Sequence, residues 1–166
     1  MNSRLGVLTL MSTVAAGCVS GVGVRPEPFP RPSAPEVISN TTSVRDSLVI
    51  TATGLTGTPY RRGGDTLRGF DCSGFTRYVF SQHGVTLPRL TREQYQVGRS
   101  IAADDVRPGD LVFFTTVAPG ASHVGVAIGR DEFVHAPSSR GVVRVERRSE
   151  RYWASRFLGA RRVLER

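Results

Sequence analysis

The chain has 166 residues, a net charge of +8 and 22 basic residues, all of which are arginine. This length allows one domain with a proper core, and a hydrophobic fraction of 39% with a charged fraction of 22% is typical of a soluble globular chain. The arginines are scattered and no aromatic-basic motif accompanies them, which disfavours nucleic acid as a partner. The charge reflects either genome composition and a solvated surface or attraction to an anionic polymer or membrane.

The first segment has the features of a targeting signal. Arg4 gives a short positive start, and residues 5–16 are apolar over a length that suits a signal peptide but not a permanent membrane span. Small residues directly before Cys18 resemble a bacterial lipoprotein signal, which implies a signal peptide over 1–17 and lipid on Cys18. Val19 then favours the outer membrane, by resemblance to enteric lipoproteins. The alternative is an ordinary secretory signal cut near residues 15–17.

Residues 18–43 are predicted to be the lipidated cysteine followed by a linker. Prolines alternate at positions 26, 28, 30 and 32, which disfavours helix and sheet and gives an extended spacer. We therefore expect the folded domain to occupy residues 44–166.

The domain begins with helical patterns and ends with strand patterns. Apolar spacing predicts helices over 44–55 and 72–83, and a short helix over 91–98 with Thr91 as its cap. After residue 108, short apolar or alternating runs between turn signals predict strands over 110–115, 124–128, 132–135, 142–146 and 157–163. Helices first and strands later favour an α+β fold, in which a helical layer packs on an antiparallel sheet of five to six strands.

Cys72 is the candidate nucleophile. If Cys18 carries lipid, Cys72 is the only thiol in the chain, and a free thiol in an oxidising compartment is a liability unless it is used. Its place at the start of a predicted helix would stabilise a thiolate through exposed backbone N–H groups and the helix dipole. His123 and His135, which lie downstream in predicted strands, are candidates for its base.

The two histidines lie on strands that should form a hairpin around residues 129–131. A strict two-residue turn would place their side chains on opposite faces, so a joint role requires a bulge or an odd-length loop. The third histidine, His83, ends a predicted helix and is expected to be a C-terminal cap or an exposed residue. A zinc site is disfavoured because no close-spaced pair of ligands exists, and no cofactor is expected.

An ordered set of motifs resembles the NlpC family of bacterial cell-wall cysteine peptidases, which have a compact papain-like fold. In chain order the set is Thr58-Pro59-Tyr60, Gly63-Gly64, Asp71-Cys72-Ser73-Gly74, Leu87-Pro88-Arg89, Arg107-Pro108-Gly109-Asp110-Leu111-Val112-Phe113-Phe114, His123-Val124-Gly125 and His135-Ala136. Any one piece is weak, but the order is specific. The resemblance covers about residues 44–164.

The resemblance implies a role for each matched position. Cys72 would be the nucleophile, His123 the general base and later the acid for the leaving amine, and His135 the group that orients the His123 ring. The Tyr60 hydroxyl and the Cys72 backbone N–H would stabilise the oxyanion. The alternative for Tyr60 is a half-buried packing residue.

Residues around the nucleophile would form the substrate groove. Asp71 and Ser73 could position substrate, although an aspartate there also suits a helix cap. A family segment that walls the groove matches Arg89, Thr91 and Gln94. Arg62 stands where many members carry tryptophan, which leaves the shape of the nearby subsite open.

The implied activity is hydrolysis of an amide bond in peptidoglycan stem peptides or cross-links, one involving D-amino acids or diaminopimelate. The enzyme would be a monomer on the periplasmic face of the outer membrane, or else secreted or periplasmic. The alternatives are an N-acetylmuramoyl-L-alanine amidase, a lipid acyl hydrolase or transferase, and a non-catalytic peptidoglycan-binding domain. The order of cysteine before histidine, with short loops, disfavours the second, and the intact Cys72, His123 and His135 disfavour the third.

Overall fold

The computed structural model describes residues 43–139 and 141–164. The predicted signal peptide over 1–17, the lipidation site Cys18 and nearly all of the linker lie outside the described residues and stay predictions. Within those two ranges, no helix is long and apolar enough to cross a membrane.

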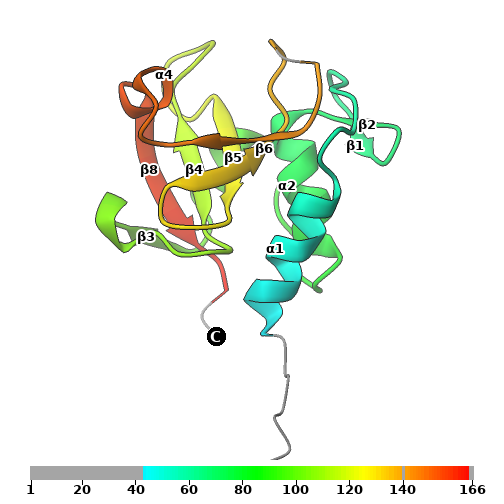
Figure 1. The fold of residues 1–166 in the computed structure, drawn as a ribbon, viewed down its shortest axis with the longest axis horizontal. Coiled ribbons are helices and arrows are strands. Elements are labelled where there is room, and N and C mark those ends of the chain that lie inside the picture. Colours follow the sequence, from blue (N-terminus) through cyan, green and yellow to red (C-terminus); the bar gives the residue numbers. More distant parts are fainter. Residues whose placement is uncertain (1–42, 140, 165–166) are drawn as a thin grey trace, which may run out of the picture. The chain divides into compact units, whose positions relative to one another are not determined.

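The chain order is helical first and mostly strand later (Figure 1). The helical elements are α1 (Val44–Gly54), α2 (Cys72–Ser81), α3 (Thr91–Gln94), a 3-10 turn at Ala103–Asp105 and α4 (Arg151–Ala154). A two-stranded ribbon, β1 (Asp65–Thr66) with β2 (Gly69–Phe70), lies between α1 and α2 in sequence.

The main sheet has six strands in the order β3-β8-β4-β5-β6-β7, and every neighbouring pair is antiparallel. Its strands are β3 (Arg99–Ile101), β4 (Leu111–Phe114), β5 (His123–Ala127), β6 (Glu132–His135), β7 (Arg144–Arg147) and β8 (Phe157–Arg162). The predicted α+β class and sheet are confirmed. The sequence does not predict β1, β2, β3 or α4, because these elements of two to four residues are too short to show a periodic pattern.

Helix α2 begins where its sequence satisfies the first backbone donors. Asp71 is the N-cap, and its Oδ1 accepts the Gly74 N–H at 2.7 Å. The predicted apolar face is buried through Phe75, Val79 and Phe80. The predicted helix over 91–98 is shorter than expected, and Thr91 is not its cap: Leu90 holds the extended N-cap conformation.

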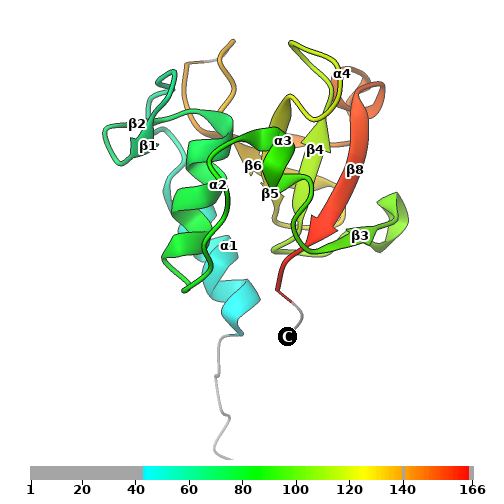
Figure 2. The ribbon, with the colours of Figure 1, turned by 180° about the vertical axis from the view of Figure 1, so that it is seen from behind.

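Both faces of the sheet are buried. Helices α1 and α2 pack on one face (Figures 1 and 2), where Leu111 and Phe113 of β4 join the larger core cluster. The alternate β4 residues, Val112 and Phe114, belong to a second cluster, which Trp153 of α4 completes. Because side chains alternate along a strand, successive β4 residues point into the two core clusters in turn, and all four β4 residues are therefore buried.

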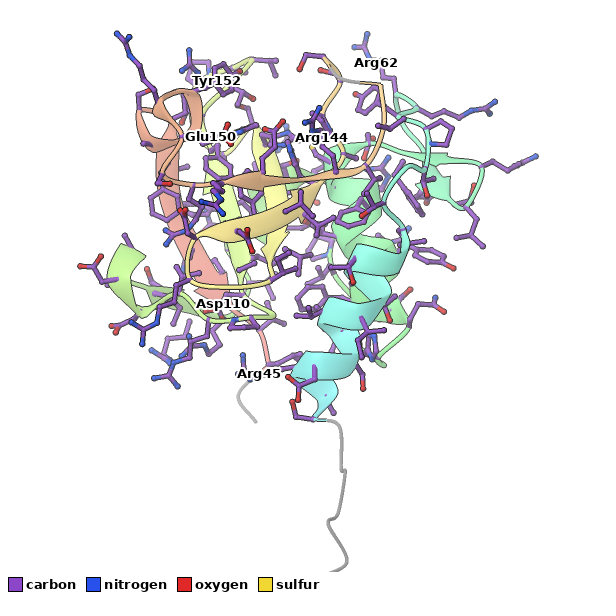
Figure 3. All side chains as sticks on the ribbon, viewed as in Figure 1. Arg45, Arg62, Asp110, Arg144, Glu150 and Tyr152 are labelled. Carbon is purple, nitrogen blue, oxygen red and sulfur yellow. The ribbon has the colours of Figure 1, made fainter. Side chains whose placement is uncertain are left out.

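A buried ionic cluster ties the two ends of the domain to the start of β4. Asp110 is fully buried, and it accepts the Arg107 backbone N–H at 2.9 Å and two bonds from the Arg162 guanidinium, at 2.8 and 2.7 Å. Arg45 of α1 adds an ion-pair contact of 3.7 Å to Asp110 and donates to the Leu164 carbonyl. Figure 3 shows Arg45 and Asp110 at the end of the domain opposite Arg62 and Tyr152.

Gly125 of β5 must be glycine for steric reasons, and this predicts a stability effect. A Cβ at Gly125 would lie 2.7 Å from the Phe133 ring, 2.8 Å from the Val134 carbonyl and 3.1 Å from His135 Cβ. We expect Gly125→Ala to lower the free energy of unfolding in urea by about 1–3 kcal/mol, as overpacking does. Gly129→Ala is the matched control, since its Cβ meets nothing within 4 Å, and equal losses in both variants would contradict the steric explanation.

Candidate active site

Cys72 is the first residue of α2, and its thiol is half-buried. Its Sγ lies 3.5 Å from Thr91 Oγ1. The backbone N–H groups of Ser73 and Val124 also interact with the sulfur. The first residue of α2 and the second residue of β5 therefore meet at one atom, the sulfur.

Burial raises the pKa of the Cys72 thiol, and the nearby Asp71 carboxylate raises it further. The Thr91 hydroxyl and the backbone N–H groups of Val124 and Ser73 act in the opposite direction without reversing the shift. The N-terminus of α2 therefore does stabilise a thiolate at Cys72, as expected, but burial raises the pKa by more than these N–H groups lower it. At neutral pH the Cys72 side chain is therefore a thiol and not a thiolate.

The hairpin of β5 and β6 brings the two histidines together. Val126 pairs with Val134, and the Ile128 N–H donates to the Glu132 carbonyl at 2.9 Å, which closes a loop of three residues. This is the odd-length loop that a joint role requires. His123 Nε2 lies 2.7 Å from His135 Nδ1, with the rings 87° apart.

Burial and, to a smaller extent, the neighbouring His135 together lower the pKa of His123 to about 3, although Glu146 opposes the shift. The ring stacks against the Trp153 indole, with centroids 5.4 Å apart and an interplanar angle of 25°. Burial also lowers the pKa of His135, and the opposing effect of Glu146 is too small to reverse this shift. Both rings are therefore neutral at pH 7, and each carries one proton that can be on either nitrogen.

Cys72 and His123 line the same cavity. Its other walls include Tyr60, Ser122, Ala136 and Trp153. Burial and the nearby Cys72 raise the pKa of the Tyr60 phenol, so its hydroxyl stays protonated and can donate a hydrogen bond. The structure thus brings Tyr60, Cys72, His123 and, behind His123, His135 into one place.

The Asp71 carboxylate is bonded to several neighbouring groups. Besides capping α2, its carboxylate makes a bidentate pair with Arg89, at 3.0 and 2.6 Å, and accepts the Gly63 N–H at 3.0 Å. Arg89 Nη1 also donates to Ser73 Oγ at 2.9 Å. Asp71 therefore caps α2, and its pair with Arg89 holds Arg89 and Ser73 beside Cys72. A role of Asp71 and Ser73 in positioning substrate stays a prediction.

The groove segment divides into lining and supporting residues. Arg62, Arg89 and Thr91 line the open hollow on one side of Cys72. Gln94, expected to wall the groove, is instead fully buried: it accepts from the Thr76 hydroxyl at 2.7 Å and donates to the Ser73 and Pro88 carbonyls at 3.0 and 2.9 Å. Gln94 joins α3 to the start of α2 and does not face substrate.

His83 plays no part in this site. Its Nε2 lies 2.9 Å from Thr51 Oγ1, a contact that links the end of α2 to α1. His83 is partly buried and bonds to α1, so it is neither the C-terminal cap nor the exposed residue that the sequence predicts. Among the residues that the structure describes, no group of three or more His, Cys, Asp and Glu could hold a metal ion.

Two residues at the site were not found from the sequence. Trp153, the chain's one tryptophan, packs against His123 and His135 from α4. Glu146 of β7 lies with its Oε2 3.4 Å from His135 Nε2. The presence of a single tryptophan beside Tyr152 was a usable signal for the first, but a glutamate in an alternating strand gave none for the second.

The geometry matches a known family. The model of the NlpC/P60 family matches residues 57–162, which is more than half of the chain. The chain belongs to the NlpC/P60 family. The resemblance seen in the motifs is thereby confirmed.

Named relatives share both sequence and fold with this chain. It is 47% identical over 111 residues to the murein DD-endopeptidase MepS/murein LD-carboxypeptidase of Escherichia coli K12, an alignment that covers 66% of this chain and 58% of that protein. It is 44% identical over 115 residues to the probable peptidoglycan endopeptidase LytE of Bacillus subtilis 168, covering 69% and 33% of the two chains. The NlpC/P60 chain thus spans little more than half the length of the first relative.

A solved structure agrees with the fold. The crystal structure of an NlpC/P60 family protein from Bacillus cereus ATCC 10987 aligns with a TM-score of 0.67 and 33% identity, over 72% of this chain and 40% of that one. The mixed α+β architecture is therefore shared with an experimentally determined member of the family.

The neutral thiol–imidazole pair predicts a specific pH dependence of alkylation. In a Cys18→Ser background, we expect iodoacetamide to react slowly with Cys72 at pH 7, and the rate to rise only above the ordinary thiol range, about pH 8.5, because burial raises the pKa of the thiol. Mass spectrometry follows the modification, and the same chain unfolded in urea is the control. A fast rate that stays constant down to pH 5 would instead reveal a preformed thiolate–imidazolium pair.

Proposed function

We propose that this chain is a peptidoglycan hydrolase: a cysteine endopeptidase that cleaves an amide bond in stem peptides or their cross-links. The observation that carries the proposal is that Cys72 and His123 line one cavity while His123 Nε2 bonds to His135 at 2.7 Å. The relatives' names support the substrate class, since MepS is called a murein endopeptidase and LytE a probable peptidoglycan endopeptidase.

The reaction follows from which atoms are free. His135 occupies His123 Nε2, so His123 Nδ1 is the nitrogen left to take the thiol proton from Cys72. The sulfur attacks the substrate carbonyl, and the oxyanion is stabilised by the Cys72 backbone N–H and the Tyr60 hydroxyl. Protonated His123 then gives its proton to the leaving amine, which yields a thioester on Cys72.

Water completes the cycle. His123, neutral again, takes a proton from a water molecule, whose oxygen attacks the thioester carbonyl. Collapse of the second tetrahedral intermediate releases the carboxylic acid and returns the proton to the sulfur. No metal or organic cofactor takes part in this sequence.

The charge around the nucleophile suits an anionic substrate. Arg62 lines the hollow beside Cys72, where the charge of Arg89 is balanced by Asp71, and the chain as a whole carries +8. Peptidoglycan stem peptides contain several carboxylates, including those of D-amino acids and diaminopimelate. A guanidinium on the groove wall can hold such a carboxylate in place during attack.

The proposed setting is the cell envelope. Residues 1–17 would be removed as a signal peptide, Cys18 would carry lipid, and the proline-rich segment up to residue 43 would connect the anchor to the domain. The enzyme would then act as a monomer from the periplasmic face of the outer membrane.

Removal of the nucleophile tests the proposed activity. We expect Cys72→Ala to reduce the release of muropeptides from purified peptidoglycan by about 1,000-fold or more, as loss of a catalytic nucleophile does. His83→Gln, a histidine variant outside the site, should keep wild-type activity. Unchanged release by a folded Cys72→Ala chain would refute the proposal.

The identity of the fragments decides between hydrolase classes. An endopeptidase gives split stem peptides, whereas an N-acetylmuramoyl-L-alanine amidase frees whole stem peptides from the glycan. We expect mass spectrometry to show split stem peptides only. Free, intact stem peptides would replace the endopeptidase proposal with the amidase one.

The anchor has its own test. We expect wild-type chain expressed in a Gram-negative host to incorporate labelled palmitate and to sediment with outer membranes, and Cys18→Ser to lose both properties. Cys72→Ala is the matched control, because it removes the other cysteine and should leave labelling unchanged. Equal labelling of wild type and Cys18→Ser would contradict the lipid anchor.

A further inference from the structure

The second nitrogen of His135 faces a group that the mechanism has not used. His135 is fully buried, and its Nδ1 is occupied by His123. Its Nε2 lies 3.4 Å from Glu146 Oε2 and has no shorter polar contact among the described residues. This distance is long for a hydrogen bond, but no other polar group of the described residues bonds to His135 Nε2, so Glu146 is the partner available to that nitrogen.

Glu146 is itself held in place from two sides. Its carboxylate is only 12% exposed, Oε2 accepts a hydrogen bond from Trp153 Nε1, and Oε1 lies 3.0 Å from Arg144 Nε. These contacts come from α4 and from the neighbouring position on the same face of β7. The contact with His135 and the hydrogen bond from Trp153 lower the pKa of Glu146, so the group is an ionised carboxylate that can only accept.

We propose that Glu146 is a positioning residue that sets the tautomers of both histidines through its contact with His135. A carboxylate cannot donate, so the His135 proton resides on Nε2, facing Glu146. His135 Nδ1 is then an acceptor, and the proton between the rings belongs to His123 Nε2. His123 Nδ1 is left with its lone pair, which is the form that can take the proton of Cys72.

The same contact acts on the charge that appears during the reaction. When His123 takes the thiol proton it becomes an imidazolium, in a place where burial disfavours charge. The Glu146 carboxylate, one ring away, favours that charge, and it raises the pKa of His123 against the larger effect of burial. Removing the carboxylate therefore lowers the pKa of the base.

Several other charged and titratable groups lie around Glu146, and an experiment on Glu146 must take them into account. His135 faces it from β6 with His123 of β5 behind, and Arg144 lies beside it on β7. From α4, Trp153 donates to it, and the N-cap residue Glu150 lines the same hollow. Figure 3 shows Arg144 and Glu150 at the same end of the sheet. Glu150 has no contact with either histidine among the interactions of the described residues, so it is a matched control.

The first experiment is independent of substrate. Nitrogen-15 NMR of the histidine rings at pH 7 is expected to show His123 and His135 both protonated on Nε2 in the wild-type chain and in Glu150→Gln. In Glu146→Ala, His135 should populate the Nδ1–H form. A wild-type His135 protonated on Nδ1, or an unchanged tautomer in Glu146→Ala, would overturn the proposal.

The second experiment measures catalysis and rests on the proposed function, with a soluble cross-linked muropeptide as substrate. We expect Glu146→Gln, whose amide oxygen can still accept from His135 and Trp153, to lower kcat about 10-fold, and Glu146→Ala about 100-fold, the range found for residues that orient a reacting group. KM should hardly change, and Glu150→Gln should stay within about twofold of wild type.

The pH profile separates positioning from mere structural support. The base must be neutral, so activity rises with pH through the pKa of His123, and this acid limb should move to lower pH in Glu146→Gln because the carboxylate raises that pKa. Glu146 would be only a packing residue if two results came together: the acid limb does not move, and Glu146→Gln and Glu146→Ala lose the same amount of activity. If no muropeptide is cleaved by wild type, the proposed function fails, while the NMR result still decides the role of Glu146.

Discussion

The bond between His123 Nε2 and His135 Nδ1 is the contact on which the site depends. At 2.7 Å it fixes one ring edge of His123 and so decides which nitrogen is left for Cys72. It exists because a three-residue loop puts both side chains on one face of the β5–β6 hairpin, and because Gly125 leaves room beside His135. The position of the His123 ring thus depends both on the length of the β5–β6 loop and on the absence of a side chain at Gly125.

Burial decides the charge state of Cys72 and His123 at neutral pH. The N-terminus of a helix contributes about 0.3–1 kcal/mol to an anion at an exposed site, whereas one pKa unit corresponds to about 1.4 kcal/mol. The His123 pKa of about 3 is several units below its usual value, so the cost of burying an imidazolium dominates. Cys72 and His123 are therefore both uncharged at neutral pH.

What the sequence could predict was local. Apolar spacing predicted α1 and α2, and alternation predicted most of the main strands, because these signals depend on residues close in the chain. The family was predicted from the order of short motifs, each of which is local and needs no knowledge of tertiary contacts. The contact of Glu146 with His135 arises between strands, and Trp153 arrives from a helix of four residues, too short to leave a periodic pattern. Gln94 shows the same limit, since burial under Ser73 and Pro88 is a tertiary fact.

The buried Asp110 cluster determines where the domain can be held. Arg45 near the first described residue and Leu164 at the last both join it, so the two ends of the domain leave from one pole. Arg62 and Tyr152, which border the hollows around Cys72, lie at the other pole (Figure 3). Mechanical load applied at Arg45 of α1 would therefore act first on the Arg45–Asp110 pair, at the pole away from the hollows around Cys72.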